Sequence, residues 1–456
     1  MQIIDLIIIA VFLIITFILG IKERKKITID DYWVNNRRTN KFVLIATVVS
    51  TFIGAGAILG AAGITFSGGG LAMFLIVGSS FFYFLIFSKF LAPKIKEFGD
   101  SYQAYSLPDF FAHRYSNKVR IMGAIIVLVS QILFLALQIL AIGVFVQAVT
   151  GFHPNIATII GSLIVIIYTA IGGLRADIRT DIFQFFVMLS LLLIFLPIII
   201  IKAGGFSVIS TLPKSFITGA GFAPFYVIIL AFLFLGTGSL SSPELWQRSY
   251  SADSVKNVKW SMRISSVIIF FFLAMAVLFG IYGKILIPEG TSNTIVPELL
   301  KSTIPTGLFG IIIAGFFAAV MSSSDSLLLI SSMTLVHDIY QKTFKKEISK
   351  EKILKISRWT TFILGIIALI VALIVFNIVH LTIEAVTFYV VLLPSIIFGF
   401  YWKRASTNAA FWSILLGFSA TLIFIFIDPI QAFIPGLMVS LISFVAITLF
   451  KKHTTN

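Results

Sequence analysis

Apolar runs of about twenty residues recur from one end of this sequence to the other, and they constrain the fold more than any other feature. Each run can cross a ~30 Å hydrocarbon core as an α-helix, whereas the strands of a membrane barrel would alternate apolar and polar residues. Only 12% of the 456 residues are charged, about half of the ~25% in soluble domains. We therefore expect an all-α integral membrane protein embedded in a lipid bilayer. About thirteen transmembrane helices are predicted, over residues 3–21, 42–64, 70–92, 120–149, 155–173, 181–201, 222–242, 262–285, 304–335, 359–378, 381–401, 408–427 and 431–450.

The net charge of +15 reflects membrane topology rather than a nucleic-acid partner. If the N-terminus lies outside, 30 of the 34 Lys and Arg residues fall in cytoplasmic stretches. The remaining four, which would lie outside, are Lys202, Lys214, Lys284 and Lys301. This asymmetry satisfies the positive-inside rule. We expect a multi-pass protein of the cell membrane with an external N-terminus and a cytoplasmic C-terminus.

The composition also excludes several kinds of chemistry. The chain has no cysteine, which excludes disulfides, thiolate metal sites and cysteine nucleophiles, and its five His residues lack metal-ligand spacing. The polar intervals are too short for a soluble catalytic domain, and they contain no catalytic constellation. We therefore do not expect an enzyme.

Two of the predicted spans contain helix-breaking residues near the middle of the membrane. One reads ATVVSTFIGAGAILGAAG at 46–63, and the other reads FLGTGSLSSPELWQR at 234–248. The glycines of the first also fit close helix packing, because small-xxx-small patterns are common in membrane helices. Proline in the second removes a backbone donor. Two interrupted spans that lie five spans apart are typical of a transporter built from two inverted repeats.

Four ordered motifs resemble those of the sodium:solute symporter family. They are DYWVNNRR at 31–38, YTAIGGLRADIRTDIFQ at 168–184, LWQRSYSA at 245–252 and AAVMSSSDSLLLISSMTLVHDIY at 318–340. One departure is Arg179, which stands where many members carry Trp. The resemblance implies a sodium-coupled secondary transporter, functional as a monomer, that takes up a small organic solute by alternating access.

The same resemblance implies a leucine-transporter-type fold of five plus five helices. Residues 1–40 would form an extra N-terminal helix and a basic cytoplasmic loop. Residues 41–201 and 202–402 would be the first and second inverted repeats, and 403–456 would add two C-terminal helices and a short tail.

Hydroxyl groups line one face of the predicted helix at 304–335. Ala319, Ser322, Ser323 and Ser326 fall at helical spacing on this face, and Asp325 lies beside it. Serines in membrane helices often bond to their own helix or to a neighbouring one, which is the alternative interpretation. Sodium is a hard cation that prefers oxygen ligands, so the face also fits an ion site.

The family resemblance assigns roles to these residues. A first sodium site would use the carbonyls of Ser50, Ile53 and Ala319 and the hydroxyls of Ser322 and Ser323. A second site, for sodium or a proton, would use Asp181, Ser322, Asp325 and Ser326. Alternatively, Asp181 begins the helix at 181–201 and stabilises its N-terminus.

A substrate pocket is expected beside the two broken helices. Its candidate residues are Phe52, Gly54, Gly56, Gln138 and Ser242. Gln138 could instead bond to a neighbouring helix. Because no unpaired Arg or Lys is evident within a span, the sequence favours a neutral or zwitterionic solute over an anion. A proton-coupled carrier of the same fold is the nearest rival, and a channel or a transport-like sensor is a further one.

Overall fold

The computed structural model describes all residues except 1, 22–27, 221–222, 343–347, 376 and 451–456. Within the described residues the chain is helical throughout, with one isolated bridge between Thr39 and Ala252. The longer elements are α1 (Ile3–Ile21), α3 (Lys41–Phe52), α5 (Met73–Ile86), α8 (Asn117–Thr150), α9 (Pro154–Ser190), α12 (Phe225–Phe234), α13 (Pro243–Ser251), α14 (Val255–Leu286), α16 (Leu308–Met333), α18 (Lys350–Ile374), α19 (Ile378–Tyr401), α20 (Thr407–Ile425) and α21 (Phe433–Phe450).

Shorter helices connect these elements. They are α2 (Ile29–Val34), η1 (Asn35–Arg37), η2 (Gly56–Gly60), α4 (Ala61–Ile64), η3 (Thr65–Gly69), η4 (Gly70–Ala72), η5 (Phe87–Leu91), α6 (Ala92–Tyr102), α7 (Leu107–Arg114), η6 (Leu191–Phe195), α10 (Leu196–Lys202), η7 (Ser207–Thr211), α11 (Lys214–Ile217), η8 (Leu235–Ser241), α15 (Ile295–Thr303) and η9 (Thr334–Gln341).

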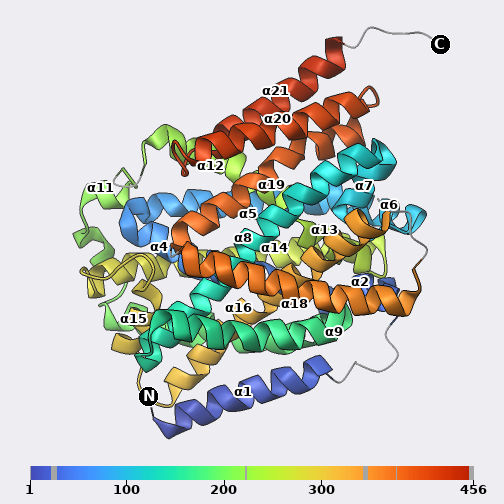
Figure 1. Cartoon of the computed structure of the whole chain (residues 1–456). Coiled ribbons are helices and arrows are strands. Elements are labelled where there is room, and N and C mark those ends of the chain that lie inside the picture. Colours follow the sequence, from blue (N-terminus) through green and yellow to red (C-terminus); the bar gives the residue numbers. More distant parts are fainter. Residues whose placement is uncertain (1, 22–27, 221–222, 343–347, 376, 451–456) are drawn as a thin grey trace, which may run out of the picture.

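The serine-rich helix α16 lies at the centre of the bundle. It packs against α9, α8 and α3. In the most apolar 18-residue stretch of this helix 89% of the residues are buried, whereas in the corresponding stretch of α1 only 22% are buried. In Figure 1, α1 runs along one side of the molecule, while α20 and α21 pack together at the opposite side. A helix surrounded by protein can carry hydroxyls at membrane depth, because other helices rather than lipid satisfy them.

Ten helices among the described residues are long and apolar enough to cross a membrane, or eleven if the bent pair at α12–α13 counts as one span. The thirteen predicted segments therefore do not all appear as separate long helices. The helix at Lys41–Phe52 is too short by itself, because the backbone breaks after it. The multi-pass membrane class is confirmed.

Both expected interruptions are present. Helix α3 ends at Phe52, Ile53 leaves the helical conformation at φ −88° and ψ 85°, and the helix resumes at Gly56. The second break falls at Ser242, directly before Pro243 at the first position of α13, where the chain bends by 44°. Proline is favoured at this position because the first turn of a helix has no use for its missing N–H.

One predicted helix begins earlier than expected. The sequence predicted separate helices at 155–173 and 181–201, and α9 (Pro154–Ser190) does consist of two helices that meet at a kink at Gly173, so the second begins directly after Gly173 rather than at residue 181. The positive φ of 69° at Gly173 suits glycine, and an added Cβ would meet the Tyr32 ring at 2.2 Å. Asp181 consequently lies inside a helix, so the alternative in which it stabilises a helix N-terminus is wrong.

Candidate cation and solute site

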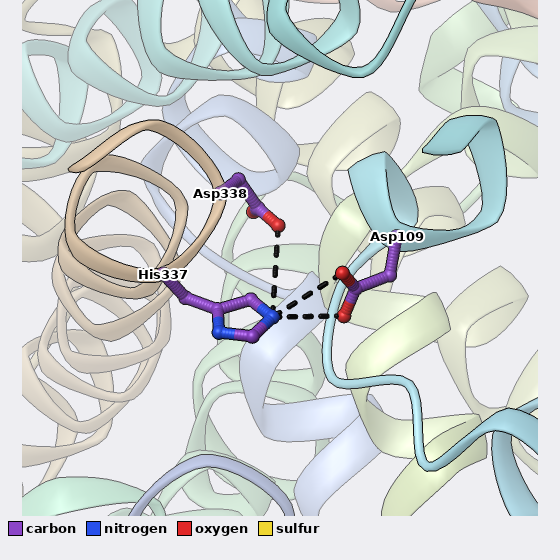
Figure 2. A group of neighbouring side chains, drawn as sticks. All are labelled: Asp109, His337 and Asp338. Atoms are coloured by element: carbon purple, nitrogen blue, oxygen red, sulfur yellow. Dashed lines mark hydrogen bonds and ion pairs between the residues drawn. The ribbon is translucent and has the colours of Figure 1, made fainter. Parts of the chain in front are cut away.

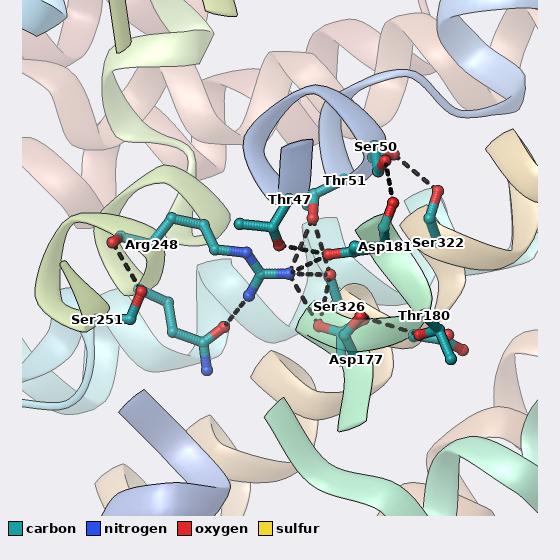
Figure 3. A network of polar contacts seen from close by, with 12 residues as sticks. Thr47, Ser50, Thr51, Asp177, Thr180, Asp181, Arg248, Ser251, Ser322 and Ser326 are labelled. Atoms are coloured by element: carbon teal, nitrogen blue, oxygen red, sulfur yellow. Dashed lines mark hydrogen bonds and ion pairs between the residues drawn. The ribbon is translucent and has the colours of Figure 1, made fainter. Parts of the chain in front are cut away.

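The hydroxyl face of α16 meets the broken end of α3. The Ser322 hydroxyl lies 2.8 Å from the carbonyl oxygen of Ser50 and 3.0 Å from that of Ala319. The Ser323 hydroxyl donates to the carbonyl of Thr51 at 2.9 Å. Ending a helix frees its last carbonyls from their usual donors, and the two serines reach these carbonyls from across the interface. Figure 3 shows the contact between Ser322 and Ser50.

Other serines of α16 follow the alternative interpretation. Ser324 donates to Val320 in its own helix at 2.7 Å, and Ser331 donates to Leu327 at 2.7 Å. Only the face toward α3 uses its hydroxyls between helices at the break. The structure therefore brings together Ser50, Ala319, Ser322 and Ser323 of the predicted first sodium site, and the fifth member, Ile53, is the buried residue at the break.

Gly54 is held tightly between two polar side chains. A Cβ at this position would lie 2.5 Å from the Ser323 hydroxyl oxygen and 2.6 Å from Gln138 Nε2. Gln138 Oε1 accepts a hydrogen bond from the backbone N–H of Ala55 at 2.8 Å. The amide thus satisfies a donor that the broken helix leaves free, and the interhelical role predicted as the alternative is confirmed.

A cavity of about 230 Å³ opens beside this break. Its lining includes all five predicted substrate residues, which are Phe52, Gly54, Gly56, Gln138 and Ser242. Thr51 and Ser323 also line it, so the candidate ion site borders the cavity. The cavity is also lined by polar residues that were not predicted from the sequence, among them Glu244, Arg248, Thr382 and Tyr389. Glu244 follows the predicted helix-breaking proline directly, and this position was a signal that could have identified it.

Gly54→Ala is expected to weaken both sodium and solute binding by at least tenfold, because the new methyl must displace Ser323 or Gln138. Gly78→Ala is the matched control, since an added Cβ meets nothing within 4 Å there. The measurement is the shift that sodium causes in the thermal unfolding of the purified protein. Equal sodium responses of the two variants would contradict the tight packing at Gly54.

A buried arginine lies where the second sodium site was predicted (Figure 3). The Arg248 guanidinium is 2.8 Å from Asp177 Oδ2 and 3.3 Å from Asp181 Oδ2, and all three side chains are inaccessible or nearly so. It also donates to Ser326 at 2.6 Å and to Thr51 at 2.9 Å. Arg248 was counted among the cytoplasmic basic residues from sequence, and its burial in an ion-pair network was not predicted. A pairing between residues so far apart in sequence has no local signal.

The four residues of the predicted second sodium site are only partly brought together. Asp181 and Ser326 share the arginine, and the Thr47 hydroxyl also donates to Asp181. Asp325 instead accepts a hydrogen bond from Thr169 at 2.5 Å. The other carboxylate oxygen of Asp181, Oδ1, is buried and has no hydrogen-bond partner among the described residues.

A second polar cluster lies where α7 meets η9 (Figure 2). His337 Nε2 is 3.0 Å from Asp109 Oδ2 and 4.0 Å from Asp338 Oδ1, while Ser106 donates to Asp338 at 2.7 Å. Burial alone would raise the pKa of Asp109, but the charge and hydrogen bond of His337 and the Tyr105 N–H lower that pKa to about 2. One His and two carboxylates could hold a metal ion. The internal hydrogen bonds favour a structural tie between α7 and the end of the serine helix.

Comparison with solved structures identifies the fold. The chain superposes on the substrate-bound, outward-open structure of a Na+-coupled sialic acid symporter with a TM-score of 0.82 and 19% identity, over 98% of each chain. It also matches MHP1, a nucleobase-cation-symport-1 family transporter, with a TM-score of 0.61 and 13% identity, over 91% of this chain and 93% of MHP1. The fold is therefore that of these membrane transporters.

Comparison of sequences identifies the family. The proline transporter OpuE of Bacillus subtilis is 24% identical over 97% of this chain and 94% of its own. A sodium/pantothenate symporter of Haemophilus influenzae is 24% identical over 96% and 95%, and a sodium/proline symporter of Salmonella typhimurium is 25% identical over 85% and 81%. The model of the sodium:solute symporter family matches residues 32–417. The chain therefore belongs to the sodium:solute symporter family, and it is a sodium-coupled solute transporter rather than an enzyme.

Proposed function

We propose that the chain binds one sodium ion between the break in α3 and the hydroxyl face of α16, and its solute in the adjoining cavity. The observation that carries this proposal is the approach of the Ser322 hydroxyl to the carbonyls of Ser50 and Ala319, at 2.8 and 3.0 Å. With the Ile53 carbonyl and the Ser323 hydroxyl, these groups supply five neutral oxygens at a helix break. Hard cations take such ligands, and transporters of this kind bind ions where helices are unwound.

Sodium would act by bridging two elements that move apart during transport. It stabilises the outward-open conformation because its ligands come from both α3 and α16, and it leaves when the two helices separate toward the cytoplasm. Such coupling requires that the ion bind the two conformations with different affinities. At about 100 mV one charge contributes about 2.3 kcal/mol, and a tenfold gradient adds about 1.4 kcal/mol. Together these terms support roughly 500-fold accumulation of a neutral solute per sodium ion.

The cavity supports a small organic solute as cargo. Its volume of about 230 Å³ and its mixture of aromatic, aliphatic and polar lining residues are those of a small-molecule site. Relatives are named for proline and pantothenate, and the solved neighbour for sialic acid. A neutral or zwitterionic solute fits a pocket whose one arginine is already bound to two carboxylates.

We further propose thirteen crossings, with the N-terminus outside, in a cell membrane protein that functions as a monomer. The two halves of α9 on either side of Gly173 would each cross, as would α3 together with α4 and α12 together with α13. The excess of Lys and Arg on the cytoplasmic side persists when Arg248, which is buried in the protein, is left out of the count. Residues 41–201 and 202–402 would then be the inverted five-helix repeats, flanked by 1–40 and 403–456.

Uptake into proteoliposomes tests the function. An inward sodium gradient is expected to drive uphill accumulation of the solute, and replacing sodium with potassium or choline should abolish it. Accumulation that follows an acidic external pH in sodium-free buffer would favour the proton-coupled alternative. Equilibration without accumulation would favour a channel.

A second cation is proposed at Asp181, as the sequence analysis suggested. Asp177 and Asp181 are both buried but share a single guanidinium, so one negative charge is left over. Such a charge at membrane depth is costly, and the unbonded Oδ1 of Asp181 is available to a cation. Ser322, Ser326 and Asp325 would complete this second sodium site after a rearrangement of the Asp325–Thr169 bond.

Asp181→Asn is expected to lower the Hill slope of sodium activation from about two to about one, because the neutral amide removes the charge that would hold the second ion. The measurement is sodium-dependent uptake or stabilisation. Asp253→Asn, in an exposed loop, is the control and should leave the slope unchanged. A reversal of solute flux at imposed gradients that fits one sodium ion per solute in the unmodified protein would exclude two coupled sodium ions.

A further inference from the structure

A buried carboxylate faces the proposed solute cavity. Glu244 is the second residue of α13, directly after the break at Ser242, and its side chain lines the cavity. It is only 8% exposed. The Ser242 hydroxyl donates to Oε2, and the Tyr389 hydroxyl donates to Oε1 at 3.3 Å. Both of these partners are neutral.

No ion pair balances the charge of Glu244 within the described part of the chain. Arg248 lies one turn further along α13, but its guanidinium contacts Asp177 and Asp181 at 2.8 and 3.3 Å. The local arginine therefore serves two carboxylates already. Removing a carboxylate from water without a cation is unfavourable, so a positive charge that enters the cavity would be strongly favoured there.

Aromatic rings surround the same space. Phe52, Phe134 and Tyr389 line the cavity, and the Phe134 and Tyr389 rings lie 5.6 Å apart. Ring faces attract organic cations through their quadrupole. An acidic group next to several rings is the combination expected for an ammonium group, which needs a counter-ion for its charge and apolar surface for its carbon substituents.

Glu244 also lies in the first turn of α13, where the helix dipole favours an anion. That role would explain a carboxylate at this position but not its exposure to the cavity beside Ser242 and Tyr389. The two roles make different predictions, because only a binding role makes affinity depend on the charge of the solute.

We propose that Glu244 is the counter-ion for a positively charged nitrogen of the solute. The cargo is then an organic amine, either a zwitterionic amino acid or a cationic amine, and not a sugar or an organic acid. This inference rests on the proposed function, since it assigns the solute to the cavity beside the first sodium site. It selects zwitterionic amino acids from the neutral or zwitterionic class and adds cationic amines to the candidate solutes.

A panel of ligands with and without a positively charged nitrogen tests the proposal on the purified protein. L-Proline, L-alanine, betaine and choline are compared with N-acetyl-proline, N-acetyl-alanine, glucose and pyruvate, each with and without sodium, by thermal unfolding. At least one of the four amines is expected to stabilise the protein with sodium present. If it is proline or alanine, its N-acetyl derivative should bind at least 100-fold more weakly; if it is betaine or choline, glucose and pyruvate should bind at least 100-fold more weakly. Stabilisation by glucose or pyruvate but by none of the amines would overturn the inference.

Three variants separate a binding role from a structural one. Glu244→Gln should weaken amine binding at least 100-fold while the stabilisation by sodium alone persists. Glu244→Asp, which keeps the charge on a shorter side chain, should retain the preference for the charged amine. Glu384→Gln on α19 is the control, because Glu384 is not among the residues that line the cavity. If Glu244→Gln binds amines like the unmodified protein, Glu244 is not the counter-ion. Loss of the sodium response in every variant and in the unmodified protein would instead contradict the proposed function.

Discussion

Ser322→Ala and Ser323→Ala are each expected to lower the affinity for sodium by about 10- to 100-fold. This range corresponds to about 1.4–2.8 kcal/mol, the size of a hydrogen bond to a charged group. The Ser322 oxygen lies within 3.0 Å of two other proposed ligands, the carbonyls of Ser50 and Ala319. Removing it leaves the remaining oxygens too few to replace the hydration of the ion.

The control for these variants comes from the same helix. Ser324 is equally buried, but its hydroxyl donates to Val320 within α16, so Ser324→Ala should leave the sodium response unchanged. The measurement is the sodium concentration that gives half-maximal uptake in proteoliposomes, together with thermal stabilisation by sodium. If Ser322→Ala and Ser323→Ala both gave the sodium dependence of Ser324→Ala, the first sodium site would be elsewhere.

Arg248→Met is expected to destabilise the protein by about 3–5 kcal/mol, the range found when one partner of a buried ion pair is removed. The substitution leaves Asp177 and Asp181 buried without their shared cation. The bonds from the guanidinium to Thr51 and Ser326 are lost as well, and these bonds join α3, α13 and α16. The apparent melting temperature in detergent measures the effect.

A double variant shows whether the charge is the cause. Adding Asp177→Asn to Arg248→Met removes one of the orphaned carboxylates, so it should restore part of the lost stability. Arg263→Met on α14 is the control, since Arg263 is only partly buried and packs over Trp260, and it should change stability by less than about 0.5 kcal/mol. Absence of rescue in the double variant would mean that packing, rather than charge, explains the loss.

The candidate residues of the first sodium site and the cavity were predictable because their signals are local. The helical period places Ala319, Ser322 and Ser323 on one face, and glycine and proline mark where the two helices break. The structure brings these features together, and all five predicted substrate residues line one cavity. Even so, no local pattern indicated that Ser322 would reach across to α3 while Ser324 bonds to its own helix.

The charged network was not predictable for the opposite reason. Arg248 follows a break and precedes a run of polar residues, a pattern that resembles the end of a membrane span. Its burial depends on Asp177, 71 positions away, and on Ser326, 78 positions away. Glu244 had a local signal, since it directly follows the helix-breaking Pro243, but its place beside Tyr389 depends on a residue 145 positions further along the chain.

By itself the sequence determined that this is a multi-pass helical membrane protein, where its helices break and which family motifs it carries. These properties follow from apolar runs, helical periodicity and the spacing of residues within motifs, each of which extends over about twenty residues. The tertiary structure alone decided which hydroxyls meet freed carbonyls, which carboxylates share an arginine and which acid faces the cavity. The contact between Ser322 and Ser50 spans 272 positions, and in a membrane interior the partner of a polar group decides both its cost and its role.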